Sequence, residues 1–131
     1  MSGHNIVDEW LRYAYNDIVV AKHCFEGLNP KQTEIASYHC QQCAEKALKA
    51  FLIYKDIEPP KTHDLKLLCR MCQDIDGSFA DIASLCAHLT PYGVTARYPD
   101  ELSPDEAMVQ LAISKAQQVY DFCISKTKVS H

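Results

Sequence analysis

The sequence predicts an all-α protein, an up-and-down bundle of about five helices. Apolar residues recur at every third or fourth position in several long segments, which is the spacing of one helix face. Helix start and stop signals fall at the ends of these segments, and no segment shows the alternation of a half-buried strand. At 131 residues, the chain is most simply a single domain spanning positions 1–131.

The first helix is expected over positions 5–26, with Gly27 supplying a left-handed residue at its end. Asn29 and Pro30 then resemble an N-cap and a first-turn proline. They predict a second helix that runs to about Tyr54. The paired Pro59 and Pro60 disfavour any continuation.

Three further helix starts follow. Thr62 is a candidate N-cap for a short helix over 63–73, and Ser78 for one over 79–88. Positions 90–102 are expected to be irregular. The last helix is predicted to start at Ser103 and Pro104, with an apolar face that reaches Cys123.

The strongest pattern lies in the second helix. Its apolar face comprises Ala36, Cys40, Cys43, Ala44, Ala47, Leu48, Phe51 and Tyr54. A polar stripe follows the same period and comprises His39, Gln42, Lys46 and Lys49. Glu45 precedes Lys49 by four residues, the favourable order for a helical ion pair.

These segments carry a family resemblance. The pieces are Gln41 to Ala50, Thr62 to Leu65 and Arg97 to Asp100, together with an opening helix that has Trp10, Ala14, Asp17 and Ala21 at helical spacing. In this order they resemble the HEPN domain (higher eukaryotes and prokaryotes nucleotide-binding), over about residues 6–122. The resemblance implies a helical bundle, a two-fold homodimer, a nucleotide ligand and a minimal nucleotidyltransferase as partner, in a system of toxin–antitoxin type.

Composition narrows the function classes. The formal net charge of −4 gives no general attraction to nucleic acid or to an anionic membrane. A local basic patch could still bind such a partner. The longest apolar run, Ala50 to Tyr54, is far short of a membrane span. The first eight residues lack the pattern of a secretion signal, so we expect a cytoplasmic protein.

Seven cysteines include two C-x-x-C pairs, Cys40/Cys43 and Cys69/Cys72. Structural zinc sites use such pairs, but on tight turns, whereas these fall inside predicted helices. We therefore expect buried, reduced thiols and no metal or other cofactor.

The candidate nucleotide site combines three segments. Free amides at the helix start near Thr62 and His63 would attract phosphate. Arg97 could grip a phosphate while Tyr98 stacks on a base. Gln42, Lys46 and Lys49 would form the opposite wall. Each feature has a plainer explanation: a helix cap, a loop pinned by Asp100, and a solvated helix face.

Catalysis is the alternative. The resemblance implies that ribonuclease members of the superfamily carry an arginine followed by four to six residues and then a histidine. None of Arg12, Arg70 and Arg97 has a histidine at that distance. We therefore assign no catalytic residue and expect a non-catalytic module. The other possibility is a ribonuclease toxin that uses a dispersed Arg97/His63 pair.

A homodimer is expected from surplus apolar residues as well as from the resemblance. Leu52 and Ile53 flank the apolar face of the second helix, and Ile35 and Tyr38 widen it at the other end. In the last helix Ile113 and Ile124 lie off the main face. A second copy could cover them. The alternative is that the short helices cover them within one monomer.

Overall fold

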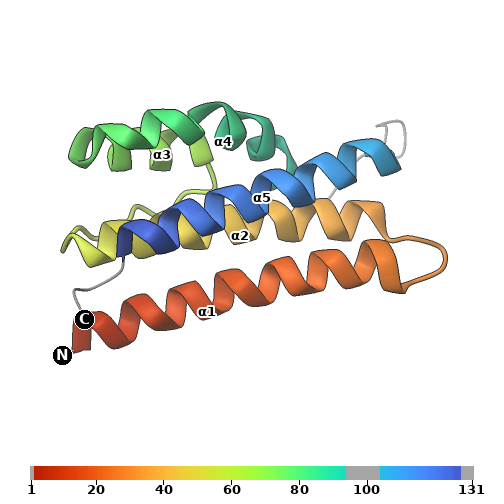
Figure 1. Ribbon diagram of the computed structural model, residues 1–131, viewed down its shortest axis with the longest axis horizontal. Coiled ribbons are helices and arrows are strands. Elements are labelled where there is room, and N and C mark those ends of the chain that lie inside the picture. The colour runs from red at the N-terminus through yellow and green to blue at the C-terminus, as the bar shows by residue number, and fades with distance from the viewer. Residues whose placement is uncertain (1, 94–103, 128–131) are drawn as a thin grey trace.

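The computed structural model describes the backbone of residues 2–93 and 104–127, and side chains from residue 6 onward. Three long helices dominate: α1 (Ser2–Lys22), α2 (Thr33–Tyr54) and α5 (Glu106–Thr127). Figure 1 shows α1 on one side of α2 and α5, and the short helices α3 (Leu65–Ile75) and α4 (Ala83–Leu89) on the other. The described residues form no strand, and the predicted all-α bundle is confirmed.

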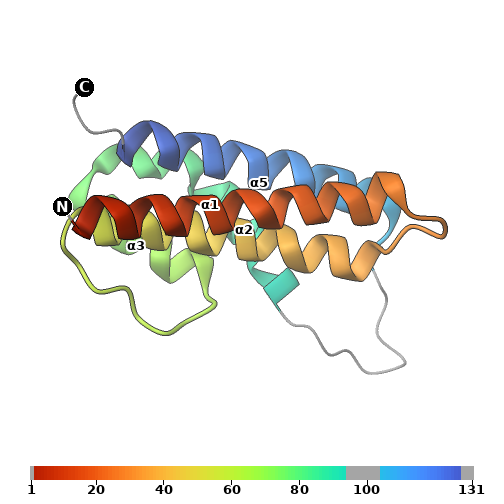
Figure 2. The same ribbon diagram turned by 90° about the horizontal axis from the view of Figure 1, so that it is seen from below.

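Helices α1 and α2 form an antiparallel hairpin, and α5 runs parallel to α2 (Figures 1 and 2). Small residues line the α1–α2 contact, because small side chains let two helices approach closely: Ala14, Ala21, Cys40, Cys43, Ala44 and Ala47 all have no exposed surface. Larger side chains of α2 and α3, such as Leu48, Phe51 and Leu68, are buried in the same core. Phe79, in the segment after α3, connects α2 to α5, with ring centroids 4.5 Å from Phe51 and 4.9 Å from Phe122.

The turn between α1 and α2 differs from the prediction. After Lys22 the chain forms one π-helical segment, His23–Gly27, and Gly27 does not have a positive φ. Asn29 and Pro30 lie in the turn, and α2 begins only at Thr33. The carbonyls of the π-helical segment take other partners, with the Gln32 amide donating to Cys24 and the Lys31 ammonium to Phe25. These bonds hold positions 28–32 outside the helix.

Helix α2 ends at Tyr54, as predicted, through a left-handed residue. Asp56 has φ of 60°. Its amide donates to Ile53, and the amide of Ile57 donates to Leu52. This is the hydrogen-bond pattern of a Schellman motif, and Ile57 packs against the core as that motif favours.

The caps of the later helices also differ. Asp64, not Thr62, caps α3, accepting from the amides of Lys66 and Leu67. Asp76, not Ser78, begins the next segment, which is a 3-10 helix over Gly77–Ile82 before α4 starts. Helix α5 starts at Glu106, with the Asp105 side chain accepting from the Met108 amide. In all three places an aspartate occupies the cap, since its carboxylate accepts amide hydrogen bonds readily.

The apolar surplus expected on α2 is partly covered within the monomer. Leu52 has no exposed surface and belongs to the core, so its assignment to an outer face was wrong. Ile113 and Ile124 are half-buried. Ile35 remains 48% exposed. The predicted irregular segment begins with a short 3-10 turn, Thr90–Gly93, and positions 94–103, including Arg97 and Tyr98, lie outside the described residues.

Candidate functional site

A buried carboxylate, Glu45 of α2, is the centre of the candidate site. Its Oε1 lies 2.9 Å from Nδ1 of His63 and 3.2 Å from Nε2 of Gln41. Its Oε2 lies 3.0 Å from Nζ of Lys49, the helical pair that the sequence predicted. Glu45 is 5% exposed. A charge so shielded from water is stable only when it is paired and hydrogen-bonded, as this one is.

The surroundings of Glu45 keep it ionised. Burial pushes the pKa of its carboxyl upward, but hydrogen bonds from His63, Lys49 and Gln41 outweigh that effect, and the pKa lies below the ordinary glutamate value. Gln41 has no exposed surface and also donates to the carbonyl of His63 at 2.8 Å. The buried amide thus fixes the segment before α3 against α2.

A second buried carboxylate repeats the arrangement between α1 and α2. Asp17, 7% exposed, places Oδ1 2.7 Å from Nδ1 of His39 and Oδ2 2.6 Å from Nζ of Lys46. Each carboxylate therefore holds one histidine with one oxygen and one lysine with the other. Residues 42, 46 and 49 are three or four apart on α2, so both clusters meet on one helix face.

The structure brings together most of the predicted site. Gln42, Lys49 and His63 converge on Glu45, with Nε2 of Gln42 3.4 Å from Oε1. Lys46 lies on the same face but pairs with Asp17. Thr62 accepts a hydrogen bond from the Asp64 amide, so it shapes the segment beside the site. Arg97 and Tyr98 lie outside the described residues.

The proposed role of the α3 N-terminus needs correction. The amides of Lys66 and Leu67 are hydrogen-bonded to Oδ1 of Asp64 at 3.0 and 3.4 Å. His63 precedes this cap and is not in the first turn. A phosphate at this helix start would have to displace a negatively charged cap, so the cations of α2 are the better anion-binding groups.

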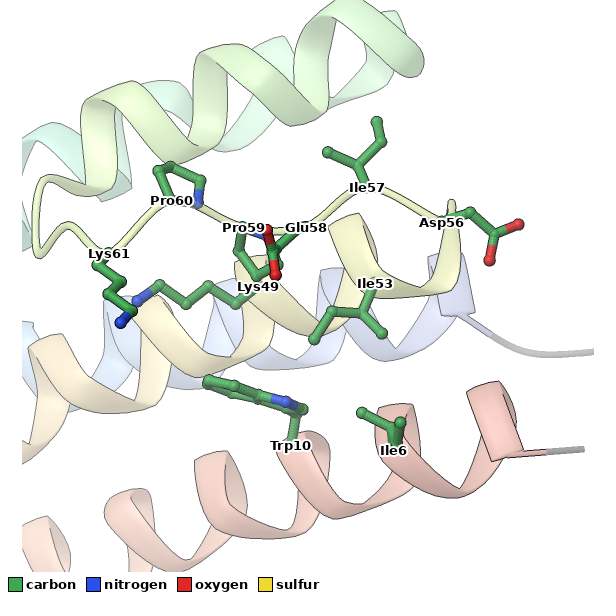
Figure 3. Close-up of a pocket in the computed structure, with 10 residues that line it drawn as sticks. All are labelled: Ile6, Trp10, Lys49, Ile53, Asp56, Ile57, Glu58, Pro59, Pro60 and Lys61. Carbon is green, nitrogen blue, oxygen red and sulfur yellow. The ribbon is translucent and has the colours of Figure 1, made fainter.

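An apolar pocket adjoins the Glu45 cluster (Figure 3). It has a volume of about 570 Å³, and Lys49 is part of its wall. Trp10 and Ile6 of α1, Ile53 of α2 and residues 56–61 of the loop between α2 and α3 form the rest. No sequence pattern indicated this pocket, because its walls come from three separate segments.

The cysteines do not form a ligand set. All seven are free and buried, and the two C-x-x-C pairs lie within α2 and α3. Across the described part of the chain, His, Cys, Asp and Glu side chains form no group of three or more that could hold a metal ion. None of the described helices is both long enough and apolar enough to cross a membrane.

Comparison with known families decides the identity. The model of the HEPN domain matches residues 7–127. The chain belongs to the HEPN domain family. The search of curated proteins gave no match.

Two solved structures resemble this HEPN domain. One is ST0689, described as an archaeal HEPN homologue, with 26% identity and a TM-score of 0.73 over 93% of this chain and 98% of that one. The other is TT1696 from Thermus thermophilus, with 23% identity and a TM-score of 0.75 over 92% of this chain and 97% of that one. The second likeness establishes the shared fold alone.

Sequence reasoning missed Asp17, His39 and Gln41 as members of the candidate site, and treated Glu45 only as a helix-pair residue. A signal for Asp17 was present: it lies one turn from the buried Ala14 and Ala21 and directly before the buried Ile18 of α1. A carboxylate at such a position needs a partner, and helical spacing on α2 offered His39 and Lys46. Gln41 carried no comparable signal.

Proposed function

We propose that this HEPN domain is a non-catalytic nucleotide-binding and interaction module. The observation that carries the proposal is the pair of buried carboxylates, each of which holds one lysine of α2 and one histidine. These ion pairs hold the lysine and histidine side chains in place before a ligand binds. A fixed cation loses less side-chain entropy on binding an anion than a mobile surface lysine does.

Hydrogen-bond capacity remains after these contacts. A lysine ammonium carries three donors, and the Lys46 side chain is 28% exposed. The His63 side chain is 73% exposed and holds the carboxylate with Nδ1, which leaves Nε2 for a ligand. Gln42 is half-buried beside them. Together with Lys49 and Thr62 these groups suit phosphate oxygens, and Arg97 and Tyr98 are proposed to complete the site.

A calorimetric titration with ATP, GTP, UTP and their diphosphates tests this function. We expect one of them to bind, and Lys46→Ala and Arg97→Ala to weaken its binding. Lys46→Ala also removes the lysine partner of the buried Asp17 carboxylate, so it should lower stability, and its affinity is measured at a temperature where circular dichroism shows the variant folded. Lys66→Ala, an exposed lysine on α3, is the matched control. Unchanged affinity in both variants would remove this site from consideration. A ligand at a hundred times its dissociation constant should also stabilise the fold by about 2.7 kcal/mol.

We further propose a homodimer that acts with a minimal nucleotidyltransferase, in a system of toxin–antitoxin type. Large apolar side chains remain exposed on α1 and α5, among them Tyr13, Val20, Met108 and Leu111, and a partner surface would cover such residues. Light scattering should give about twice the chain mass of 14.8 kDa. A monomer mass at micromolar concentration would refute the dimer. Seven free, buried thiols support a reducing compartment such as the cytoplasm.

A ribonuclease is the second candidate, favoured by the Glu45–His63 contact. A carboxylate on Nδ1 orients an imidazole so that Nε2 can accept a proton, the geometry of an oriented general base. Arg97 would then have to stabilise the phosphate. Incubation of the protein with total RNA, without metal, separates the two functions. Cleavage that is lost in both His63→Ala and Arg97→Ala would establish the enzyme and overturn the non-catalytic proposal.

A further inference from the structure

The pocket beside the Glu45 cluster is lined mainly by aliphatic and aromatic side chains. Its cavity of about 570 Å³ falls within the roughly 300–1,000 Å³ of small-molecule sites. Figure 3 shows the indole of Trp10 and the side chains of Ile6 and Ile53 on the side formed by α1 and α2. Trp10 is half-buried, so one part of the indole is held by packing while another faces the cavity. A flat aromatic surface in an apolar wall favours a planar ring as ligand.

Two ammonium groups mark one end of this pocket. In Figure 3 the side chains of Lys49 and Lys61 extend toward the same end of the cavity. The Lys49 ammonium has Glu45 as its carboxylate partner. Lys61 is exposed and has no ion pair or hydrogen bond with any described side chain. Lys61 therefore has no carboxylate partner among the described residues, and its ammonium can bind the negative group of a ligand.

The carboxylates of the loop do not fill that role. Asp56 and Glu58 also line the pocket, but neither forms an ion pair with Lys61 within the described part of the chain. Figure 3 shows the Asp56 carboxylate directed away from Trp10. Glu58 remains a negative charge near the cavity, and it should weaken the binding of an anion.

We infer that this pocket binds a small planar aromatic anion, with the ring against Trp10 and the negative group at Lys61 and Lys49. This inference goes beyond the proposed nucleotide function, because it concerns the Trp10 pocket, and of the described groups proposed to bind phosphate only Lys49 also lines that pocket. Aromatic carboxylates and nucleotides share the required chemistry, a planar ring that carries a negative group. The Lys49 ammonium has further donors beyond the one directed at Glu45, so it can contribute without breaking the Glu45 cluster.

The single tryptophan of the chain provides the assay. Nitroaromatic compounds quench indole fluorescence, so 4-nitrobenzoate, 4-nitrobenzamide and 4-nitrobenzylamine form a matched set of anion, neutral compound and cation. We expect saturable quenching by 4-nitrobenzoate and much weaker binding of the other two. Lys61→Gln should weaken 4-nitrobenzoate binding about five- to tenfold, the range for a partly exposed charge-assisted contact. It should leave 4-nitrobenzamide unchanged.

Two further variants test whether negative charge near the pocket weakens 4-nitrobenzoate binding. Glu58→Gln should tighten 4-nitrobenzoate binding about two- to threefold by removing a nearby like charge. Lys66→Gln, on an exposed position of α3 outside this pocket, should change nothing. Tighter binding of 4-nitrobenzylamine, or an unchanged affinity in Lys61→Gln, would overturn the inference.

Competition with AMP identifies the source of the ligand. Displacement of 4-nitrobenzoate by AMP would support the pocket and assign it to nucleotides. Failure of AMP to displace it, with the Lys61 dependence intact, would support the pocket and assign it to aromatic acids. Either result is independent of Lys46, which pairs with Asp17 outside this cavity.

Discussion

Replacing Glu45 with alanine tests the central contact of the candidate site. The change removes the acceptor for His63 and Lys49 and for one of the Gln41 hydrogen bonds. The Lys49 side chain is only 10% exposed, so its ammonium would be left nearly buried without a counter-charge. Removing one partner of a buried ion pair costs about 3–5 kcal/mol.

The expected cost lies at the lower end of this range. Lys49 lines the pocket beside α1, and a modest rotation would bring its ammonium into water. Gln41 keeps its hydrogen bond to the carbonyl of His63. We therefore expect Glu45→Ala to lower the free energy of unfolding by about 3 kcal/mol and the melting temperature by about 10 °C.

Urea unfolding followed by circular dichroism measures this cost. Glu9→Ala, on an exposed position of α1, is the control and should stay within about 0.5 kcal/mol of the parent. The double variant Glu45→Leu/Lys49→Leu removes both charges and should recover much of the loss, since buried pairs can be replaced by apolar residues at little cost. A loss below about 1 kcal/mol in Glu45→Ala would refute the buried-pair reasoning.

Glu45→Ala should also change how the free energy of unfolding depends on pH in the acidic range. The folded pKa of Glu45 is lowered, so its contribution is present above the unfolded glutamate pKa of about 4.3. It is lost as pH falls through the folded value. The stability difference between parent and Glu45→Ala should therefore persist at pH 5 and shrink below about pH 4. A difference that grew toward acid would contradict the lowered pKa.

Three further predictions concern packing and backbone. Gly93→Ala should cost about 1–2 kcal/mol, because its Cβ would lie 3.0 Å from Cδ of the buried Gln41, whereas Gly77→Ala, with nothing within 4 Å, should be near neutral by urea unfolding. Asp56→Gly should stabilise by about 0.5 kcal/mol, since φ of 60° favours glycine; destabilisation would reveal an unrecognised role for the aspartate. A thiol reagent should label the native protein slowly and all seven cysteines after unfolding. Each is buried, and burial raises the pKa of the Cys40 thiol to about 12. Fast labelling of several thiols in the native state would refute this packing.

The sequence alone determined the helical class and much of its element order. Periodicity decided this, because apolar residues three and four apart define one face of a helix whatever lies opposite. It also determined where α2 ends and that Glu45 and Lys49 pair, since both depend on neighbours within about one turn. Boundaries shifted where two polar residues competed for a cap. At α3 and at the 3-10 segment after it, aspartate took the position assigned to Thr62 and Ser78.

Only the tertiary structure decided which residues form the site. The Asp17 contacts join α1 to α2 across 22 and 29 positions, and those of Glu45 reach His63 across 18. No helical period encodes such distances. A lysine on a polar stripe can be solvated or can form an ion pair with a buried carboxylate. Which of the two occurs depends on how closely two helices approach. That approach is set by the small residues between them. The Trp10 pocket likewise exists only because α1, α2 and the following loop meet at one end of the bundle.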